Sequence, residues 1–191
     1  MYQILQGKNC LITGATGGLG KNIAKEFAKS GCNLFLTGRN NKKLNSLKNE
    51  LENSQNQIKI NFENTDLLNT KEIKKLIEKV KSTFENIDIL VNCAGVFQVK
   101  LLSDSTVEDF DKCFGVNVKA AFILSKEFSQ GMITKKWGRI VNIASSSAYA
   151  AKHAELLDQF GSALTGKGIN FDSILSSLSS GSLDVCGGVP N

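Results

Sequence analysis

A glycine-rich stretch near the N-terminus carries the first chemistry that the sequence offers, the binding of a diphosphate. Thr13-Gly14-Ala15-Thr16-Gly17-Gly18-Leu19-Gly20 follows an apolar run and precedes an amphipathic helix pattern over residues 18–30. Glycines lack the Cβ atoms that would hold the backbone away from a ligand, and a helix start offers free N–H groups and the positive end of the helix dipole. A strand, a glycine turn and a helix start in this order predict a diphosphate site.

The residues after the next apolar run indicate which dinucleotide would bind. In a parallel sheet the ligand lies at the carboxyl ends of the strands, and the run 33–37 ends in Gly38-Arg39. An acid there would accept hydrogen bonds from a ribose 2′-hydroxyl, whereas Arg39 supplies a guanidinium for a 2′-phosphate and Gly38 leaves room for it. Arg39 can equally be an ordinary loop arginine. The sequence therefore favours NADP, with NAD as the alternative.

Alternating strand and helix patterns must position these residues. Strands are expected at 9–13, 33–37, 58–62, 87–92 and 139–145, and helices near 18–30, 41–53, 70–85 and 106–130. Ser105-Thr106-Val107-Glu108 predicts a capping box at the start of the last helix. Strands at this spacing, apolar on both sides of the pleat, predict an α/β fold. We expect a doubly wound parallel sheet covered by helices on both faces, in three layers α/β/α.

The composition is typical of one soluble globular domain and argues against other classes of protein. The 191 residues are 41% hydrophobic and 21% charged. No N-terminal apolar signal region or membrane-spanning run is found, which predicts a cytoplasmic protein without membrane contact. The net charge of +5 comes partly from lysines at helical spacing in 71–81, typical of a solvated helix face rather than a nucleic-acid site. Five scattered cysteines and one histidine predict reduced core thiols and no metal site.

Ordered motifs along the chain resemble those of the short-chain dehydrogenase/reductase family, whose members have a Rossmann-like fold. The resemblance covers residues 7 to about 147 almost continuously. It rests on the glycine loop 13–20, Asp66-Leu67, Asn92-Cys93-Ala94-Gly95, Val116-Asn117-Val118 and the strand 138–146. In the family, the acid at Asp66 meets the adenine amino group. The resemblance implies these cofactor-binding residues: Thr13, Gly14, Thr16, Gly18, Leu19, Gly20, Arg39, Asp66, Leu67, Asn92, Ala94 and Gly95.

The resemblance also implies a catalytic set that interconverts a carbonyl and an alcohol. Ser145 would polarise the carbonyl, and Asn117 would hold a water of the proton relay. The family's acid/base is a tyrosine followed four residues later by a lysine, whose ammonium lowers the phenol pKa from about 10. Asp66, Asn117 and Ser145 each have a structural alternative. Asp66 can be a turn or N-cap acid, Asn117 a residue that hydrogen-bonds within its helix, and Ser145 a strand-end turn residue.

Tyr149 and Lys152 are the candidates for the tyrosine–lysine pair, although their spacing departs from the family pattern. The family places its tyrosine farther beyond the serine, near residues 157–159, where this chain has none. Lys152 stands at i+3, and His153 occupies i+4. At 3.6 residues per turn, Lys152 is rotated by about 100° from the usual lysine. Tyr149 and Lys152 can equally be ordinary residues of a helix start.

The C-terminal part departs further from the family. Residues 168–171 resemble the start of a sixth strand and residues 180–188 resemble the last strand, without the helices that normally cap the substrate. We predict a single Rossmann-type domain over 1–191, well matched over 1–147 and degenerate, with a shortened C-terminal part, over 148–191. The shortening also argues against the family's dimer-forming helices, although a homo-oligomer stays open.

Two functions are consistent with these residues. The first is an NAD(P)-dependent short-chain oxidoreductase that interconverts a carbonyl and an alcohol on a small-molecule substrate, with NADP(H) favoured. The alternative is a catalytically impaired or truncated member that retains nucleotide binding only. The cofactor half of the pattern, residues 13–95, is common to both, whereas the departure around Tyr149 separates them.

Overall fold

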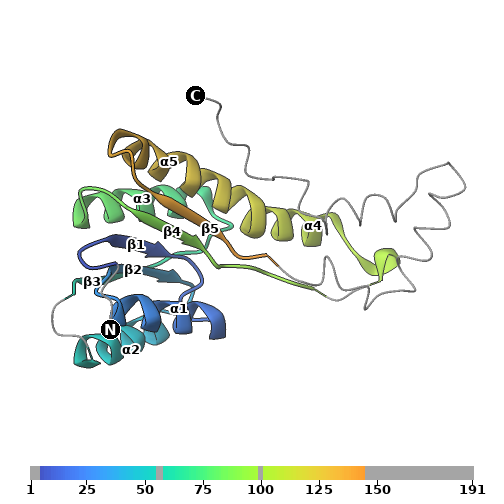
Figure 1. Cartoon of the computed structure of the whole chain (residues 1–191). Helices are drawn as coiled ribbons and strands as arrows, with labels where there is room; N and C mark the ends of the chain where they lie inside the picture. The colour runs from blue at the N-terminus through green and yellow to red at the C-terminus, as the bar shows by residue number, and fades with distance from the viewer. Residues whose placement is uncertain (1–4, 55–57, 99–100, 145–191) are drawn as a thin grey trace, which may run out of the picture. The chain divides into compact units, whose positions relative to one another are not determined.

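The structure, a computed structural model, describes residues 5–54, 58–98 and 101–144 (Figure 1). By its contacts the chain divides into two units, Met1–Ile143 and Ala144–Asn191, and every element below belongs to the first. Ser145, Tyr149, Lys152 and the sixth-strand pattern lie outside the described residues. The single-domain organisation over 1–191 therefore stays a prediction.

Strands and helices alternate along the described chain, as the hydrophobic pattern predicts. The strands are β1 (Asn9–Ile12), β2 (Asn33–Gly38), β3 (Ile60–Asn64), β4 (Ile89–Asn92) and β5 (Arg139–Asn142). The helical elements are α1 (Gly18–Lys29), α2 (Asn41–Ser54), α3 (Thr70–Thr83), the 3₁₀ turn η1 (Leu102–Asp104), α4 (Val107–Phe114), the π-helical turn η2 (Gly115–Lys119) and α5 (Ala120–Thr134). The ends of β3, β4 and β5 differ from those predicted by a few residues, because apolar runs and paired residues need not coincide.

The five strands form one parallel sheet in the order β3-β2-β1-β4-β5. Leu11 at the centre pairs with Phe35 of β2 on one side and with Leu90 of β4 on the other. The chain thus moves outward from β1 to β3 and then returns to place β4 beside β1. The direction of winding reverses between β1 and β4, and in open α/β sheets a ligand crevice lies at the carboxyl ends of the strands at this point.

Helices cover both faces of the sheet, which confirms the predicted three-layer α/β/α fold (Figure 1). Neighbouring strand residues point to opposite faces, so Leu11 and Ile12 belong to different cores. One core joins the sheet to α1 and α2 through Ile12, Leu34, Leu36, Ala24, Ala28, Leu44, Leu47 and Leu51. The other joins it to α3 and α5 through Leu11, Phe35, Leu90, Ile73, Leu76, Val80, Ala120, Leu124 and Phe128.

The prediction of one continuous α-helix over 106–130 is wrong in one respect, because a π-helical turn interrupts the α-helix. α4 ends at Phe114, the backbone continues through the π-helical turn η2, and α5 then runs to Thr134. A π turn closes i→i+5 hydrogen bonds in place of i→i+4 bonds. Side-chain types do not reveal such a turn, since the apolar spacing around it still suits a helix.

The capping box of α4 lies one residue later than predicted. Thr106, not Ser105, is the N-cap, because its backbone is extended (φ −107°, ψ 165°) and the helix begins at Val107. The Thr106 hydroxyl accepts the N–H of Asp109, and the Asp109 carboxylate accepts the N–H of Thr106, both at 3.2 Å. The box therefore pairs a threonine with an aspartate in place of the predicted serine and glutamate.

The C-terminus of α5 is a Schellman motif with a lysine at the left-handed position. Lys136 has φ 53°, and its N–H donates to the carbonyl of Ile133 at 3.0 Å. The N–H of Trp137 donates to the carbonyl of Met132 at 3.1 Å. Gly138 follows, where a Cβ would lie 2.3 Å from the Met132 side chain. The turn therefore requires glycine at the entry to β5.

Trp137, the only tryptophan of the chain, lies at the amino end of the sheet. The Lys8 Nζ atom is 4.1 Å from the centre of its ring, and the Arg139 guanidinium is 5.2 Å away. Lys8 directly precedes β1, and Arg139 is the first residue of β5. The indole and its two cations are thus at the end of the sheet opposite to the expected ligand crevice.

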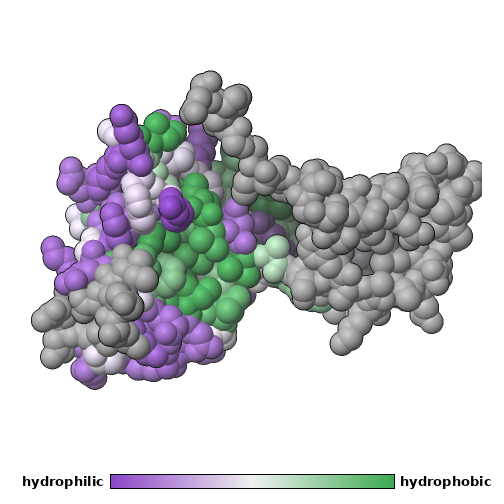
Figure 2. All heavy atoms as spheres, viewed as in Figure 1, coloured by the Kyte–Doolittle hydropathy of each residue, from purple (hydrophilic) through white to green (hydrophobic). Residues whose placement is uncertain are grey.

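Strand β5 forms an edge of the sheet in the described part of the chain, and its apolar side chains are exposed. Figure 2 shows hydrophobic atoms gathered over the region in which Figure 1 draws β4 and β5. Ile140, Val141 and the following Ile143 are 38%, 40% and 40% exposed. Within the described ranges, no helix combines the length and the apolar character that crossing a membrane requires.

Candidate functional site

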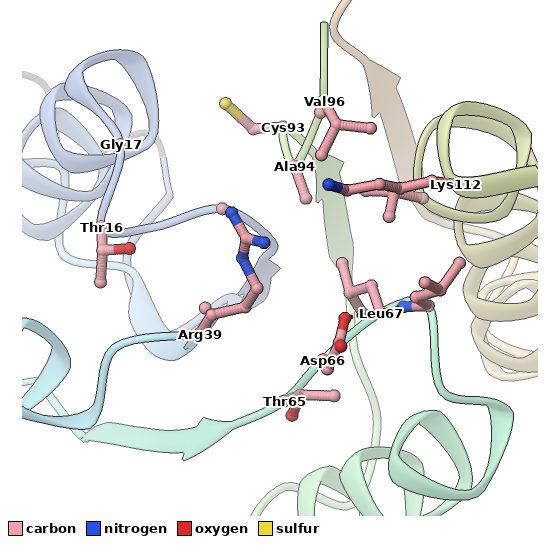
Figure 3. Close-up of a pocket in the computed structure, with 15 residues that line it drawn as sticks. Thr16, Gly17, Arg39, Thr65, Asp66, Leu67, Cys93, Ala94, Val96 and Lys112 are labelled. Carbon is pink, nitrogen blue, oxygen red and sulfur yellow. Dashed lines mark hydrogen bonds between the residues drawn. The ribbon is translucent and has the colours of Figure 1, made fainter. Parts of the chain in front are cut away.

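A cavity of about 250 Å³ opens at the carboxyl ends of β1, β2, β3 and β4, where the strand order predicts a ligand. Figure 3 shows its side chains converging from several elements. It is lined by Gly14, Thr16, Gly17, Gly38, Arg39, Thr65, Asp66, Leu67, Leu68, Cys93, Ala94, Gly95, Val96, Lys112 and Val116. The structure thus brings together the glycine loop, the residues after β2 and β3, and the turn after β4.

The turn from β1 to α1 passes so close to its neighbours that only glycine fits at two positions. Gly14 has φ +66°, and a Cβ there would lie 2.7 Å from the Cα of Ala94. A Cβ on Gly20 would lie 2.3 Å from the carbonyl oxygen of Gly14. Gly18, by contrast, has no atom within 4 Å of its Cβ position. Gly14 and Gly20 are therefore required by the fold, whereas Gly18 leaves space that a ligand can use.

The start of α1 has amide groups that no side chain caps. Its N-cap is Gly17, with an extended backbone (φ −78°, ψ 165°), and no acidic residue stands in the first turn. The first N–H groups of a helix have no partner within the helix, and together with the dipole they favour an anion. This helix start thus fits a diphosphate group.

Arg39 lies at the rim of the cavity, where β2 ends. Its exposed side chain points into the cavity from the wall that also carries Thr16 (Figure 3). A Cβ on Gly38 would lie 3.0 Å from the Thr16 hydroxyl, so a side chain at position 38 would crowd this wall. Among the described residues Arg39 forms no ion pair. Its guanidinium is accordingly available to an anionic ligand.

Asp66 is both a turn residue and a lining residue of the cavity. Its Oδ1 atom accepts the N–H of Leu68 at 3.0 Å, and its own N–H donates to Glu72 at 2.7 Å. It is not the cap of α3, since Asn69 accepts the N–H of Lys71 at 3.0 Å in that role. The carboxylate remains directed at the cavity (Figure 3), where it can accept from a ligand amino group.

Asn117, in the π-helical turn, holds the loop that follows β4. Its Oδ1 atom accepts the N–H of Val96 at 2.8 Å, and its Nδ2 atom donates to the carbonyl of Val96 at 2.9 Å. Nδ2 also lies 3.3 Å from the sulfur of Cys113. The amide therefore fixes the position of the Gly95–Val96 backbone beside the cavity. Its role in a proton relay stays a prediction.

Some predicted cofactor residues do not line the cavity; these are Thr13, Gly18, Leu19, Gly20 and Asn92. Thr13 and Asn92 are buried, at 2% and 6% exposure, and form hydrogen bonds beneath the residues that line the cavity. Asn92 Nδ2 donates to Asn142 Oδ1 of β5 at 2.9 Å and to Ser125 Oγ of α5 at 3.3 Å. It thus connects the end of β4 to β5 and to α5.

Other lining residues were not among the predicted site residues; these are Gly17, Gly38, Thr65, Leu68, Cys93, Val96, Lys112 and Val116. Most of them adjoin a predicted residue in sequence. Lys112 does not, because it comes from α4. It stands four residues before Val116, so that both lie on one helix face, and Val116 precedes the predicted Asn117. That spacing alone does not place Lys112 at the cavity, because its position depends on how α4 packs beside the loop after β4.

The cysteines in the described part are free thiols, namely Cys10, Cys32, Cys93 and Cys113. Cys93 lies in the cavity wall, and burial raises the pKa of its thiol. Burial, with a smaller contribution from Cys32, raises the pKa of Cys10 well above its usual range. Among the described residues no group of three or more side chains could hold a metal ion.

Known proteins share these motifs over most of the described chain. The sequence profile of the family described as short chain dehydrogenase matches residues 8–156. The 3-oxoacyl-(acyl-carrier-protein) reductase FabG of Rickettsia bellii (strain RML369-C) is 39% identical over 141 residues, which are 74% of this chain and 55% of the relative. The D-beta-hydroxybutyrate dehydrogenase of Cupriavidus necator is 34% identical over 160 residues, 78% of this chain and 61% of the relative. The chain thus spans little more than half the length of these curated relatives.

Solved structures share the fold. A metagenomic short-chain oxidoreductase in complex with NADP matches with a TM-score of 0.69 and 30% identity, over 74% of this chain and 63% of that one. The L-sorbose reductase of Gluconobacter frateurii, complexed with NADPH and L-sorbose, matches with a TM-score of 0.68 and 28% identity, over 71% and 51%. Since the strand order, the glycine turn and the sequence match agree, the chain belongs to the short-chain dehydrogenase family.

Proposed function

We propose that this chain binds NADP(H) and interconverts a carbonyl and an alcohol on a small molecule. The proposal rests on one observation, the convergence of the glycine turn, Arg39 and Asp66 on a single cavity at the carboxyl ends of the strands. The uncapped start of α1 suits the diphosphate, Arg39 suits the 2′-phosphate, and the Asp66 carboxylate suits the adenine amino group. The NADP-bound and NADPH-bound relatives support the same cofactor.

The nicotinamide, when bound, supplies or accepts a hydride, and the chain's own residues handle the proton. Ser145 donates a hydrogen bond to the substrate oxygen. Tyr149 gives its phenolic proton to that oxygen in the direction of reduction and takes it back in the direction of oxidation. Lys152 stabilises the phenolate, and Asn117 positions the neighbouring loop through Val96. These roles are carried over from the family motif, residue by residue.

A second candidate is a chain that binds the nucleotide without turnover. The observation that favours it is the sequence after Tyr149, where histidine rather than lysine stands at i+4. At helical spacing, positions i+3 and i+4 differ by about 100° around the helix axis, so Lys152 does not match the family's lysine.

Two measurements on the full chain separate these candidates. Isothermal titration calorimetry with NADPH and NADH measures binding, and loss of NADPH absorbance with a panel of ketones, aldehydes and a 3-oxoacyl thioester measures turnover. We expect NADPH to bind more tightly than NADH and at least one carbonyl class to be reduced. Binding without turnover on the whole panel supports the second candidate, and failure to bind either nucleotide rules out both.

A further inference from the structure

We propose that Lys112 is a second cationic ligand of the 2′-phosphate, acting from the wall opposite Arg39. This inference deepens the proposed function and rests on the use of NADP(H). Lys112 belongs to no motif that the sequence singles out, and the structure alone brings it to the nucleotide cavity. The argument depends on where its side chain lies, what holds it there and which charges surround it.

The two cations enter the same cavity from different elements. Arg39 stands at the end of β2, whereas Lys112 belongs to the last turn of α4. Figure 3 shows the two side chains directed toward the space between them, with the Lys112 ammonium on the side of Ala94 and Val96. Lys112 is half-buried, so part of its stem is packed and its ammonium is less free to leave the cavity than that of a surface lysine.

Helix α4, which carries Lys112, is held at both ends. At its start, the Thr106–Asp109 capping box holds the first turn of α4. At its end, Asn117 contacts the sulfur of Cys113, the residue after Lys112, and binds the backbone of Val96 through two hydrogen bonds. The position of Lys112 is thus coupled to the loop after β4, which forms the adjoining part of the cavity wall.

The charges of the cavity are unbalanced. Asp66 is the only acid among the described residues that line the cavity, and one of its oxygens already accepts the N–H of Leu68. Over the ranges that the structure describes, neither Arg39 nor Lys112 forms an ion pair. Two cations and one acid give the cavity lining a net positive charge, which favours the binding of an anion.

A phosphate monoester suits this arrangement better than the diphosphate does. It carries up to two negative charges and three oxygens, enough to contact a guanidinium and an ammonium at the same time. The diphosphate has its own site at the start of α1, where the N–H groups that follow the N-cap Gly17 have no side-chain cap. We therefore assign Lys112 to the group that distinguishes NADPH from NADH.

The test is the dissociation constant of each nucleotide, measured by calorimetry on the full chain. The variants are Lys112→Gln, Lys112→Arg and, as a matched control, Lys126→Gln. Lys126 is an exposed lysine of α5 that does not line the cavity. Lys112→Gln should weaken NADPH about tenfold, as expected for one charge–phosphate contact, and should leave NADH within about twofold. Lys112→Arg should restore most of the loss, and Lys126→Gln should change neither affinity.

Salt adds an independent readout, since screening weakens charge contacts. NADPH affinity should fall less steeply with ionic strength in Lys112→Gln than in the unchanged chain. Circular dichroism melting checks that each variant is folded. Unchanged NADPH affinity in Lys112→Gln overturns the inference, and a parallel loss for NADH overturns the assignment to the 2′-phosphate. Failure of the unchanged chain to bind NADPH is a separate result, because it overturns the proposed function itself.

Discussion

The side-chain oxygen of Thr13 accepts the backbone N–H of Ala94 at 3.0 Å, joining the loop after β1 to the loop after β4. The N–H of Cys93 donates to the same oxygen at 3.0 Å, and the hydroxyl itself donates to the carbonyl of Val91 at 3.4 Å. These contacts cross the point at which the strand order reverses. One buried hydroxyl thus holds together two turns that line the nucleotide cavity.

Replacement of Thr13 by valine should therefore affect both stability and binding. Valine keeps the shape but leaves the partly buried N–H of Ala94 without an acceptor, whereas the N–H of Cys93 keeps the carbonyl of Val91 at 3.1 Å. An unsatisfied donor of this kind costs about 1–3 kcal/mol. We expect a lower free energy of unfolding in urea and a weaker affinity for NADPH. Thr13→Ser, which keeps the oxygen, is the control and should lie close to the unchanged chain. Equal stability of Thr13→Val and Thr13→Ser would show that the hydroxyl contributes nothing.

Two glycines of the same loop should respond differently to alanine. In Gly20→Ala the new Cβ meets the Gly14 carbonyl at 2.3 Å, so the turn must shift, and we expect a lower Tm together with lost NADPH binding. In Gly18→Ala the Cβ enters open space, so Tm should be unchanged while NADPH affinity falls. Differential scanning calorimetry and nucleotide titration measure the two effects. Equal NADPH affinity in Gly18→Ala and the unchanged chain would place the diphosphate elsewhere.

The choice between the two nucleotides should depend on Arg39. Arg39→Asp removes a charge-assisted contact of about 1.5–3 kcal/mol and adds repulsion toward the 2′-phosphate. The new carboxylate can also accept from a ribose 2′-hydroxyl. NADPH affinity should thus fall by more than tenfold, while NADH affinity holds or improves. If both dissociation constants moved in parallel, Arg39 would be an ordinary loop residue.

The proton-transfer assignment is tested by three variants outside the described residues. Tyr149→Phe removes one phenolic O–H, so turnover should disappear while NADPH affinity stays the same. Lys152→Ala should lower both turnover and NADPH affinity, because the family's lysine, which Lys152 would replace, stabilises the phenolate and also holds the nicotinamide ribose. His153→Ala is the comparison at the i+4 position. Greater damage from His153→Ala than from Lys152→Ala, in steady-state kinetics, would make the histidine the working partner.

The thiol of Cys93 should react slowly and in a pH-dependent manner. Burial raises its pKa above the usual value of about 8.5, so at pH 8 less of it is thiolate, the form that alkylates. The rate at which iodoacetamide labels Cys93, measured by peptide mass spectrometry, should therefore rise at a higher pH than the labelling rate of a solvent-exposed thiol. Because Cys93 lines the cavity, NADPH should slow the labelling further. The exposed Cys113 is the internal comparison, and faster labelling of Cys93 at pH 8 would contradict the prediction.

Much of the fold could be predicted because local chemistry determines it. Strands that are apolar on both sides of the pleat indicate a parallel sheet with helices on both faces. The residues that follow β1, β2 and β3 could be located from the order of the motifs. The carboxyl ends of parallel strands meet at one edge, so Gly14, Arg39 and Asp66 had to lie together.

The parts that could not be predicted depend on backbone geometry or on contacts between distant segments. The π-helical turn η2 leaves no signature in side-chain type. The cap at Thr106 rather than Ser105 depends on which residue takes the extended conformation. The entry of Lys112 into the cavity follows from how α4 packs beside the loop after β4, which no spacing within one segment reveals.

Because Trp137 is the only tryptophan, its fluorescence can report on this chain without an added label. The indole lies at the amino end of β5, and the nucleotide cavity opens at the carboxyl ends of the strands, about 13 Å away along the four residues of β5. A bound nucleotide therefore cannot touch the ring. Emission changes during unfolding report the release of Lys8 and Arg139 from the indole. Quenching of Trp137 by NADPH reports energy transfer to the reduced nicotinamide. The same indole therefore gives one signal for unfolding and a different one for nucleotide binding.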